Sequence, residues 1–255
     1  MRNVLAIAQK ELKSYFSSPI GYIVIGFWAF LYGIFFVPML QMFVRQSMQM
    51  GMMGGGPQSM NLNQQLIRPL MQNVSVLVLF VLPAVTMRTY SEEKKSGTIE
   101  LLLTSPLTDW EIILGKFLGA MGLYGAMLLV TTINIAILFV YGNPEWKSVA
   151  IVYLGLLLLG GAFISLGLFI SSLTRNQIVA FVATFGVALM LWVITWFNFA
   201  GPPWGTLTQY LSIIEQFDDF GKGVVDTSHI IYYLSFITFG LFLTAKSVES
   251  ERWRG

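Results

Sequence analysis

The sequence predicts an all-α membrane protein with six transmembrane helices, and three observations carry this prediction. Hydrophobic residues make up 55% of the 255 residues and charged residues only 11%, whereas soluble domains carry charge at about a quarter of their positions. The alternating pattern of a membrane β-barrel is absent, and helices let the backbone satisfy its own hydrogen bonds in lipid. Six apolar stretches reach the roughly 20 residues that a spanning helix needs, namely 20–44, 69–87, 117–141, 149–173, 177–199 and 229–247.

The distribution of Lys and Arg sets the expected orientation. If the N-terminus lies inside, the inner segments carry eleven of the 15 basic residues and the outer segments carry four. The positive-inside rule therefore predicts that both termini lie in the cytoplasm. The first apolar stretch follows a polar segment of 19 residues and is as long as a full span. We therefore expect it to stay as an anchor rather than to be cleaved as a signal peptide.

Residues 1–18, before the first span, predict an amphipathic helix. Apolar side chains recur at helical spacing on one face, and Lys10 and Lys13 lie opposite. Such a helix would lie along the inner membrane surface, either as an anchor or as a docking face for a cytoplasmic partner. The expected apolar face consists of Val4, Leu5, Ala8, Leu12, Tyr15 and Phe16.

Residues 45–68 predict a flexible external loop, because they are rich in Met, Gly and polar residues. Thioethers spaced as in Met48, Met50 and Met52 are soft ligands that could hold Cu(I). No His or Cys joins them, and Met is also common on adaptable apolar surfaces. Copper binding is therefore the lesser alternative, and we assign no metal site to the chain.

Residues 88–116 form the one long polar stretch between apolar runs that also carries dense charge, and we expect it to be cytoplasmic. Gly97 interrupts its charged beginning. Thr98 can cap a short helix that continues to Leu103. The residue before Pro106 avoids helical geometry, so the short helix ends there.

Thr108 and Glu111 then predict a capping box at the start of the next apolar run. Two chain breaks therefore isolate a short cytoplasmic helix with an apolar surface. Such a surface is costly in water unless it is covered, either by the chain's own spans or by another protein. Its apolar residues are Ile99, Leu101, Leu102 and Leu103, and its acidic neighbours are Glu92, Glu93 and Glu100.

The later spans contain small residues, beginning at Gly115, that let helices approach closely. A very short inner turn at 172–176, containing Arg175, joins the fourth and fifth spans. Residues 201–228 carry too many charges for a span, yet apolar residues recur there at helical spacing, which predicts an interfacial or re-entrant segment on the outer side. His229, the only histidine, is expected to be a polar residue at the membrane edge.

Several function classes are excluded by what the sequence lacks. No charged residue lies in the middle of a predicted span, which leaves proton-coupled transport without relay groups. With one His and no Cys, the chain has no metal motif or nucleophile–base pair for an intramembrane protease. A Walker loop is also absent, so we expect no catalytic site and no cofactor here, and ATP and Mg in a partner subunit. The net charge of +2 is too small to indicate a nucleic-acid partner.

The stretch YSEEKKSGTIELLLTSP at 90–106, followed by WEIILGK at 110–116, resembles the signature of ABC-2 type permeases. These are the membrane subunits of one class of ATP-binding cassette (ABC) transporters. Three further motifs resemble the gliding-motility-associated branch of these permeases: SPIGY at 18–22, FDDFGKGVVD at 217–226 and SVESERWR at 247–254. The resemblance covers essentially the whole chain apart from the Met- and Gly-rich loop.

The resemblance implies a single permease domain over 1–255 with ABC-2 permease architecture, in the bacterial cytoplasmic membrane. Two permeases, identical or related, would pair in the lipid bilayer, each on a cytoplasmic ABC ATPase subunit, and an extracytoplasmic accessory protein is a further candidate partner. The short cytoplasmic helix would be the coupling helix that inserts into the ATPase, and 201–228 would hold the external gate element. The implied ATPase-coupling residues are Glu92, Glu93, Gly97, Thr98, Ile99, Glu100, Leu101, Leu102, Leu103, Pro106 and Arg175.

The leading interpretation is therefore the permease subunit of an ATP-driven exporter. The alternative is a non-transporting membrane anchor for an ATPase or for a motility or secretion complex. An inner cavity lined by the second and fifth spans of a dimer would favour transport, and a sealed, fully packed interface would favour the anchor. A passive channel is a weaker interpretation, because no polar ring repeats along any span. Uncharged, aromatic-rich spans suit a lipid or amphipathic substrate better than a small ion, but they do not name it.

Overall fold

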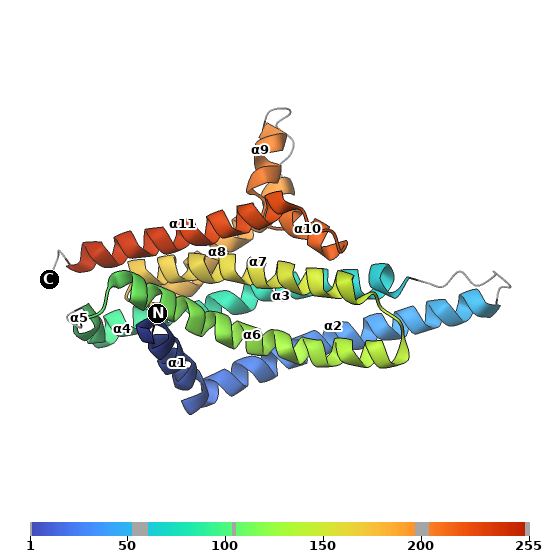
Figure 1. Cartoon of the computed structure of the whole chain (residues 1–255), viewed down its shortest axis with the longest axis horizontal. Helices are drawn as coiled ribbons and strands as arrows, with labels where there is room; N and C mark the ends of the chain where they lie inside the picture. The colour runs from blue at the N-terminus through green and yellow to red at the C-terminus, as the bar shows by residue number, and fades with distance from the viewer. Residues whose placement is uncertain (1, 53–60, 104–105, 197–203, 253–255) are drawn as a thin grey trace.

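The computed structural model describes residues 2–52, 61–103, 106–196 and 204–252. Within these ranges all regular structure is helical, and six helices are long and apolar enough to cross a membrane, which confirms the predicted class. They run up and down along an elongated bundle (Figure 1). The six helices are α2 (Pro19–Met52), α3 (Arg68–Thr86), α6 (Asp109–Tyr141), α7 (Trp146–Leu173), α8 (Gln177–Val193) and α11 (Thr227–Arg252).

Helix α7 is the central helix, in contact with α3, α6, α8, α11 and the short helix α10 (Glu215–Gly221). Its glycines lie where neighbours come closest. A Cβ on Gly160 would lie 2.1 Å from the ring of Tyr124 on α6, and one on Gly167 would lie 2.0 Å from the hydroxyl of Thr86 on α3. No larger residue fits at either position without moving a helix, so small residues set the bundle's packing.

Helices α2 and α8 bury little of their surface within the chain. Only 17% of the most apolar stretch of each is buried, against 67% for the stretch that contains α3. Apolar side chains therefore cover the outer faces of these helices and face lipid or another protein.

The N-terminal helix α1 (Arg2–Ser17) crosses the beginning of α6 and makes its most extensive contacts there. Gly115 and Gly119 of α6 form the seat for α1. A Cβ on Gly115 would lie 2.6 Å from the side chain of Ile7, and one on Gly119 would lie 2.6 Å from that of Glu11. The helix is therefore held against a span and not only against the membrane surface.

The buried face of α1 matches the predicted apolar face in part. Val4, Ala8, Leu12 and Tyr15 are buried or partly buried, as predicted. Leu5 is 60% exposed and Phe16 is also exposed, whereas Ile7 and Glu11 are partly buried. The prediction was wrong for these positions because it sorted side chains by polarity alone. The glycine seat on α6 selects the face of α1, and Glu11 finds a cationic partner there.

Two span boundaries also differ from those predicted. Helix α2 continues to Met52, well past residue 44, because the Gln, Met, Arg and Ser residues after the apolar stretch are compatible with a helix. The predicted loop at 45–68 is therefore partly helical, and it also contains the π-helix η1 (Asn63–Ile67); its residues 53–60 lie outside the described ranges. Helix α6 begins at Asp109 rather than at 117.

The early start of α6 comes from the capping box, which is confirmed. The Thr108 hydroxyl accepts a hydrogen bond from the backbone N–H of Glu111 (3.3 Å), and the Glu111 carboxylate accepts one from the backbone N–H of Thr108 (3.1 Å). Both otherwise unpaired backbone donors are satisfied. The connection that leads into α6 therefore ends at Thr108, whereas the polar composition of the stretch extends to residue 116.

The segment expected at 201–228 to be interfacial or re-entrant contains two short helices, α9 (Trp204–Leu211) and α10. Between them the carbonyl of Ile213 accepts a hydrogen bond from the hydroxyl of Tyr233 on α11 (2.8 Å), and Ile213 itself is fully buried. The backbone N–H of Ile213 donates to the carbonyl of Leu191 on α8 (3.4 Å), so both backbone groups of Ile213 bond to other helices at the break. Apolar spacing alone could not reveal the break.

The bundle has two different ends. The short helices α4 (Ser91–Ser96) and α5 (Thr98–Leu103), the turn after α7 and the C-terminal end of α11 lie at one end, with α1 beside them (Figure 1). Helix α10 and η1 lie toward the other end.

Candidate functional site

The polar stretch folds as two short helices separated by one glycine. Gly97 has φ 74°, the left-handed conformation that ends α4 and that a residue with a Cβ rarely adopts. Acidic residues occupy the first turn of α4 and basic residues its last turn, as the helix dipole favours. The sequence analysis predicted α5 and the glycine break but not α4.

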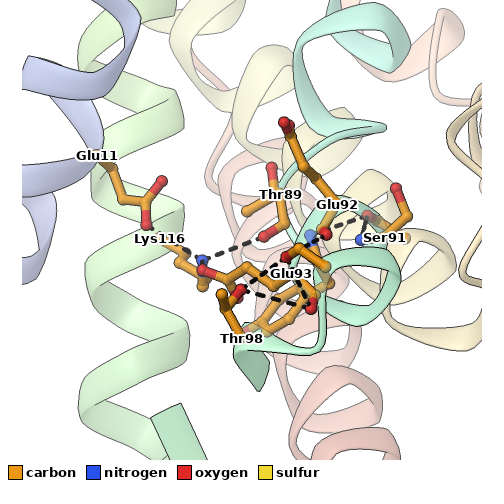
Figure 2. A network of polar contacts seen from close by, with 10 residues as sticks. Glu11, Thr89, Ser91, Glu92, Glu93, Thr98 and Lys116 are labelled. Carbon is orange, nitrogen blue, oxygen red and sulfur yellow. Dashed lines mark hydrogen bonds and ion pairs between the residues drawn. The ribbon is translucent and has the colours of Figure 1, made fainter. Parts of the chain in front are cut away.

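A buried lysine ties α4 to two other helices. The ammonium of Lys116, on α6, donates to the carboxylate of Glu93 (2.7 Å) and to that of Glu11 (3.1 Å), and also to the backbone carbonyl of Thr89 (3.1 Å). Figure 2 shows the three acceptors converging on it. The ring of Tyr90 lies below the ammonium, 5.1 Å from its centroid.

The burial of the Lys116 ammonium determines how much its ion pairs matter for stability. The Lys116 side chain is 1% exposed, and those of Glu11 and Glu93 are 15% and 19% exposed. An ammonium has three donors, and all three have an acceptor here. Removing one partner from such a group leaves an uncompensated charge in a poorly hydrated place, which is strongly destabilising.

Two further ion pairs fasten the same end. Lys94 of α4 lies 2.5 Å from the carboxylate of Glu251 on α11, and its side chain is almost completely buried. Arg252 of α11 lies 3.0 Å from the carboxylate of Asp109 at the start of α6. Helices α4 and α6 are therefore both joined to the last turns of α11.

A serine of α7 caps the turn that leads into α4. The hydroxyl oxygen of Ser171 accepts from the backbone N–H groups of Tyr90 and Ser91 (3.1 Å each) and donates to the carbonyl of Met87 (3.0 Å). One buried hydroxyl thus binds two backbone N–H groups at the start of α4 and the carbonyl of the residue that follows α3. The corner between α3 and α4 is fixed against the bundle's central helix.

The predicted acidic residues take different positions. Glu93 points inward to Lys116, and Glu92 pairs with Arg88 one turn before it (2.8 Å). Glu100 is exposed on α5. The structure therefore separates one buried carboxylate from two that remain nearer the surface.

Of the remaining predicted coupling residues, Ile99 is buried and packs against the core cluster. Gly97, Thr98, Pro106 and Arg175 are exposed, and Thr98 is the first residue of α5, its hydroxyl donating back to the carbonyl of Glu93 (3.5 Å). The backbone of 101–103 belongs to α5, and the side chains of Leu101, Leu102 and Leu103 lie outside the described part of the chain.

An open pocket of about 250 Å³ lies between α1 and the corner that joins α3 to α4. Glu11, Tyr15, Arg88 and Glu93 are among its lining residues, so charges of both signs face it. Burial, with the Glu11 charge as a second cause, raises the pKa of Tyr15 to about 12, so its phenol stays a hydrogen-bond donor at neutral pH.

Sequence reasoning missed Lys116 and Glu11. Each carried a signal: Lys116 interrupts an otherwise apolar run, and Glu11 falls among apolar residues at helical spacing. A charged residue on an apolar face indicates a partner, because burying an unpaired charge is costly. Nothing local indicates which partner, since Glu11 and Lys116 are 105 positions apart.

Within the described ranges, no group of three or more His, Asp or Glu residues is arranged to hold a metal ion. The methionines considered as copper ligands, Met48, Met50 and Met52, belong to the end of α2.

The fold and the site define a multi-pass membrane subunit with a pair of short helices fastened to one end of its bundle. The family model described as "ABC-2 family transporter protein" matches residues 5–250, nearly the whole chain. The chain therefore belongs to the ABC-2 family of transporter proteins.

Two curated relatives share part of the sequence. "Probable multidrug ABC transporter permease YbhR" from Escherichia coli (strain K12) is 35% identical over 101 residues, which cover 40% of this chain and 27% of the relative. The protein of the same description from Escherichia coli O157:H7 matches with the same values. The matched segment thus spans about a quarter of the length of these relatives.

Proposed function

We propose that this permease subunit belongs to an ATP-driven exporter and that a separate cytoplasmic ABC ATPase, which supplies ATP and Mg chemistry, docks on α5 and on the turn at 174–176. The observation that carries the proposal is that ion pairs hold α4 against other helices of the bundle. A short helix anchored by buried ions to α1, α6 and α11 can pass on a displacement, whereas an unanchored loop would absorb it.

The arrangement of the ends supports the proposed orientation. Both described chain ends, α4–α5 and the α7–α8 turn lie at the same end of the bundle, which is the end that carries most of the Lys and Arg residues. We place this end in the cytoplasm and the protein in the bacterial inner membrane, with both termini inside. The segment that contains α9 and α10 then lies outside, as an external gate element that an accessory protein could reach.

The largely uncovered faces of α2 and α8 support pairing with a second permease copy or a related permease. A pocket of about 240 Å³ lined by α3, α8 and α10 supports transport rather than a sealed anchor. Its lining combines the amides of Gln72 and Asn73 and the carboxylate of Asp218 with apolar Val76 and Phe217, which suits an amphipathic substrate. The motifs at 18–22, 217–226 and 247–254 support placement in the gliding-motility-associated branch.

The test is to isolate the tagged chain with the ATPase that copurifies and to reconstitute the complex in liposomes. The double variant Leu102→Asp, Glu100→Arg changes the character of the docking helix. We expect ATP hydrolysis to persist while ATP-dependent export of the amphipathic dye Nile red is lost. The matched control is Glu249→Arg, the same charge reversal on α11 at the same end of the bundle, which should retain export.

Two results would contradict the proposal. One is normal Nile red export by the double variant. The other is the absence of any ABC ATPase from the purified complex of the parent chain.

A further inference from the structure

Lys116 joins three helices that are far apart in the sequence. Its acceptors belong to α1, to the first turn of α4 and to the corner before α4, and they lie 105, 23 and 27 positions away. The ammonium itself belongs to α6, a spanning helix.

Apolar packing alone would not fix these helices in the same way. Dispersion and hydrophobic contacts are non-directional, whereas three hydrogen bonds from one ammonium define a direction for each acceptor. A buried ion pair is seldom the most stable solution, and its best-attested use is to fix one arrangement among several. Lys116 therefore constrains how α1, α4 and α6 sit relative to one another.

The contacts of Lys116 with Glu11, Glu93 and Thr89, called the tie below, lie between α5 and two spanning helices. Helix α5 follows α4 directly through Gly97, and the Glu93 carboxylate of α4 contacts Lys116 at the start of α6. Helix α1 leads into α2 through a tight junction, since a Cβ on Gly21 would lie 2.6 Å from the carbonyl oxygen of Tyr15. A displacement of α4 is thus passed to α6 directly and to α2 through α1.

We propose that Lys116 is a positioning residue for transport: it makes α1, α4 and the start of α6 move as one body when α5 is displaced. This rests on the proposed function for the origin of the displacement, but the tie itself exists in the chain alone. The two parts can therefore be tested separately in one experiment.

The experiment measures the distance between α1 and α4. The chain has no cysteine, so the exposed residues Lys13 and Lys95 can be changed to Cys and spin-labelled without removing any native thiol. Double electron–electron resonance on the full chain in lipid nanodiscs then reports the width of the distance distribution. The parent should give one narrow distribution.

Three variants separate positioning from stability. Lys116→Met leaves two buried carboxylates unpaired and should both destabilise the chain and broaden the distribution. Lys116→Met with Glu11→Gln and Glu93→Gln removes the unpaired charges, so thermal stability should largely return while the broad distribution remains. Lys222→Met, which removes a lysine from the other end of the bundle, is the control and should keep the parent's narrow distribution.

A narrow, parent-like distribution in the triple variant would overturn the proposal. Should the triple variant not fold, the single variants Glu93→Met and Glu11→Met decide, because each removes one side-chain acceptor of the Lys116 ammonium. We expect each to broaden the distribution by less than Lys116→Met, and unchanged widths in both would overturn the proposal.

A second arm adds the copurified ATPase with ATP and vanadate. In the parent the α1–α4 distance should stay constant while the distance from Lys95 to a label at Ile178 on α8 changes; in the triple variant the α1–α4 distance should change too. Nile red exported per ATP should fall about tenfold in the triple variant, a size common for coupling between sites. If ATP changes no distance, the proposed function fails. The distance distributions measured without the ATPase still test whether Lys116 holds α1 and α4 in one arrangement.

Discussion

The two ends of the bundle each hold a cluster of ion pairs, and the clusters differ in burial. At one end Lys116 is 1% exposed between Glu11 and Glu93. At the other end, Lys222 is 43% exposed and pairs with Asp218 (2.7 Å) and Asp219 (2.8 Å). The charges are similar, but the cation of the first cluster is sealed from water, whereas that of the second is not.

The second cluster also joins several elements. Arg68 at the start of α3 lies 2.9 Å from Asp218, and the two nitrogens of His229 on α11 face Asp219 (2.9 Å) and the side-chain amide of Gln216. Exposed pairs contribute little to stability and are screened by salt. We infer that the buried cluster holds helices in one arrangement, whereas the exposed cluster joins α10 to its neighbours in a way that can be released.

The largest expected effect is the loss of the buried cation. Lys116→Met should destabilise the chain by about 3–5 kcal/mol, because it leaves buried carboxylates unpaired. Lys222→Met, the corresponding change in the exposed cluster, should cost less than about 1 kcal/mol. Equilibrium unfolding of the two purified variants beside the parent measures the difference, and equal effects would remove the contrast between the two ends.

The seat that presents Glu11 to Lys116 gives the next largest effect. Gly115→Ala should destabilise by about 1–3 kcal/mol, because the added methyl group would lie 2.6 Å from Ile7. Gly125→Ala on the same helix meets nothing within 4 Å and should stabilise by about 0.5–1 kcal/mol. The same unfolding measurement applies, and a neutral Gly115→Ala would show that α1 does not depend on this seat.

The start of α6 carries a smaller, local contribution. Thr108→Ala removes the hydroxyl that caps the helix beside the buried cluster and should cost about 1 kcal/mol. Thr108→Ser keeps a hydroxyl and should cost much less. Hydrogen exchange of the first-turn amides of α6 reports the effect, and unchanged protection in the alanine variant would contradict a role for the capping box.

The smallest effect concerns pH at the exposed cluster. Hydrogen bonds from Lys222 and His229 hold the pKa of Asp219 below its usual value. A lowered carboxyl pKa stabilises the fold above its unfolded-state value, and this contribution is lost as the pH falls through the folded-state value. Acidification to below about pH 4 should therefore release α10, seen as sharper electron-paramagnetic-resonance lines from a spin label at Glu215→Cys.

The control for this prediction is Asp219→Asn with the same label. Its spectrum should already be sharper at neutral pH and should change less on acidification. A steep pH response that persists in Asp219→Asn would assign the effect to another group, such as Asp218.

The parts of the structure that depend on local sequence were predictable. Apolar length located the six spans, and the spacing of Thr108 and Glu111 located the capping box because its hydrogen bonds span only three residues. Gly97 was recognisable as a break because few other residues take its backbone conformation. The predicted bounds of α5 match for the same reason.

The parts that depend on tertiary contacts were not predictable. The inward turn of Glu11 follows from a glycine seat on another helix, and the break before α10 follows from the hydroxyl of Tyr233. Lys116 stands at the edge of an apolar run, where lysines ordinarily extend toward water. Its burial becomes understandable only when α1 and α4 are seen to converge on it.

The central claim is that the end with the buried cluster faces the cytoplasm and the end with the exposed cluster faces outward. The most direct test is labelling of single cysteines at Lys95 and at Glu215 with a membrane-impermeant maleimide, in intact cells and in inverted vesicles. The account predicts that Lys95→Cys reacts only in inverted vesicles and Glu215→Cys only in intact cells. Reaction of Lys95→Cys in intact cells would contradict it.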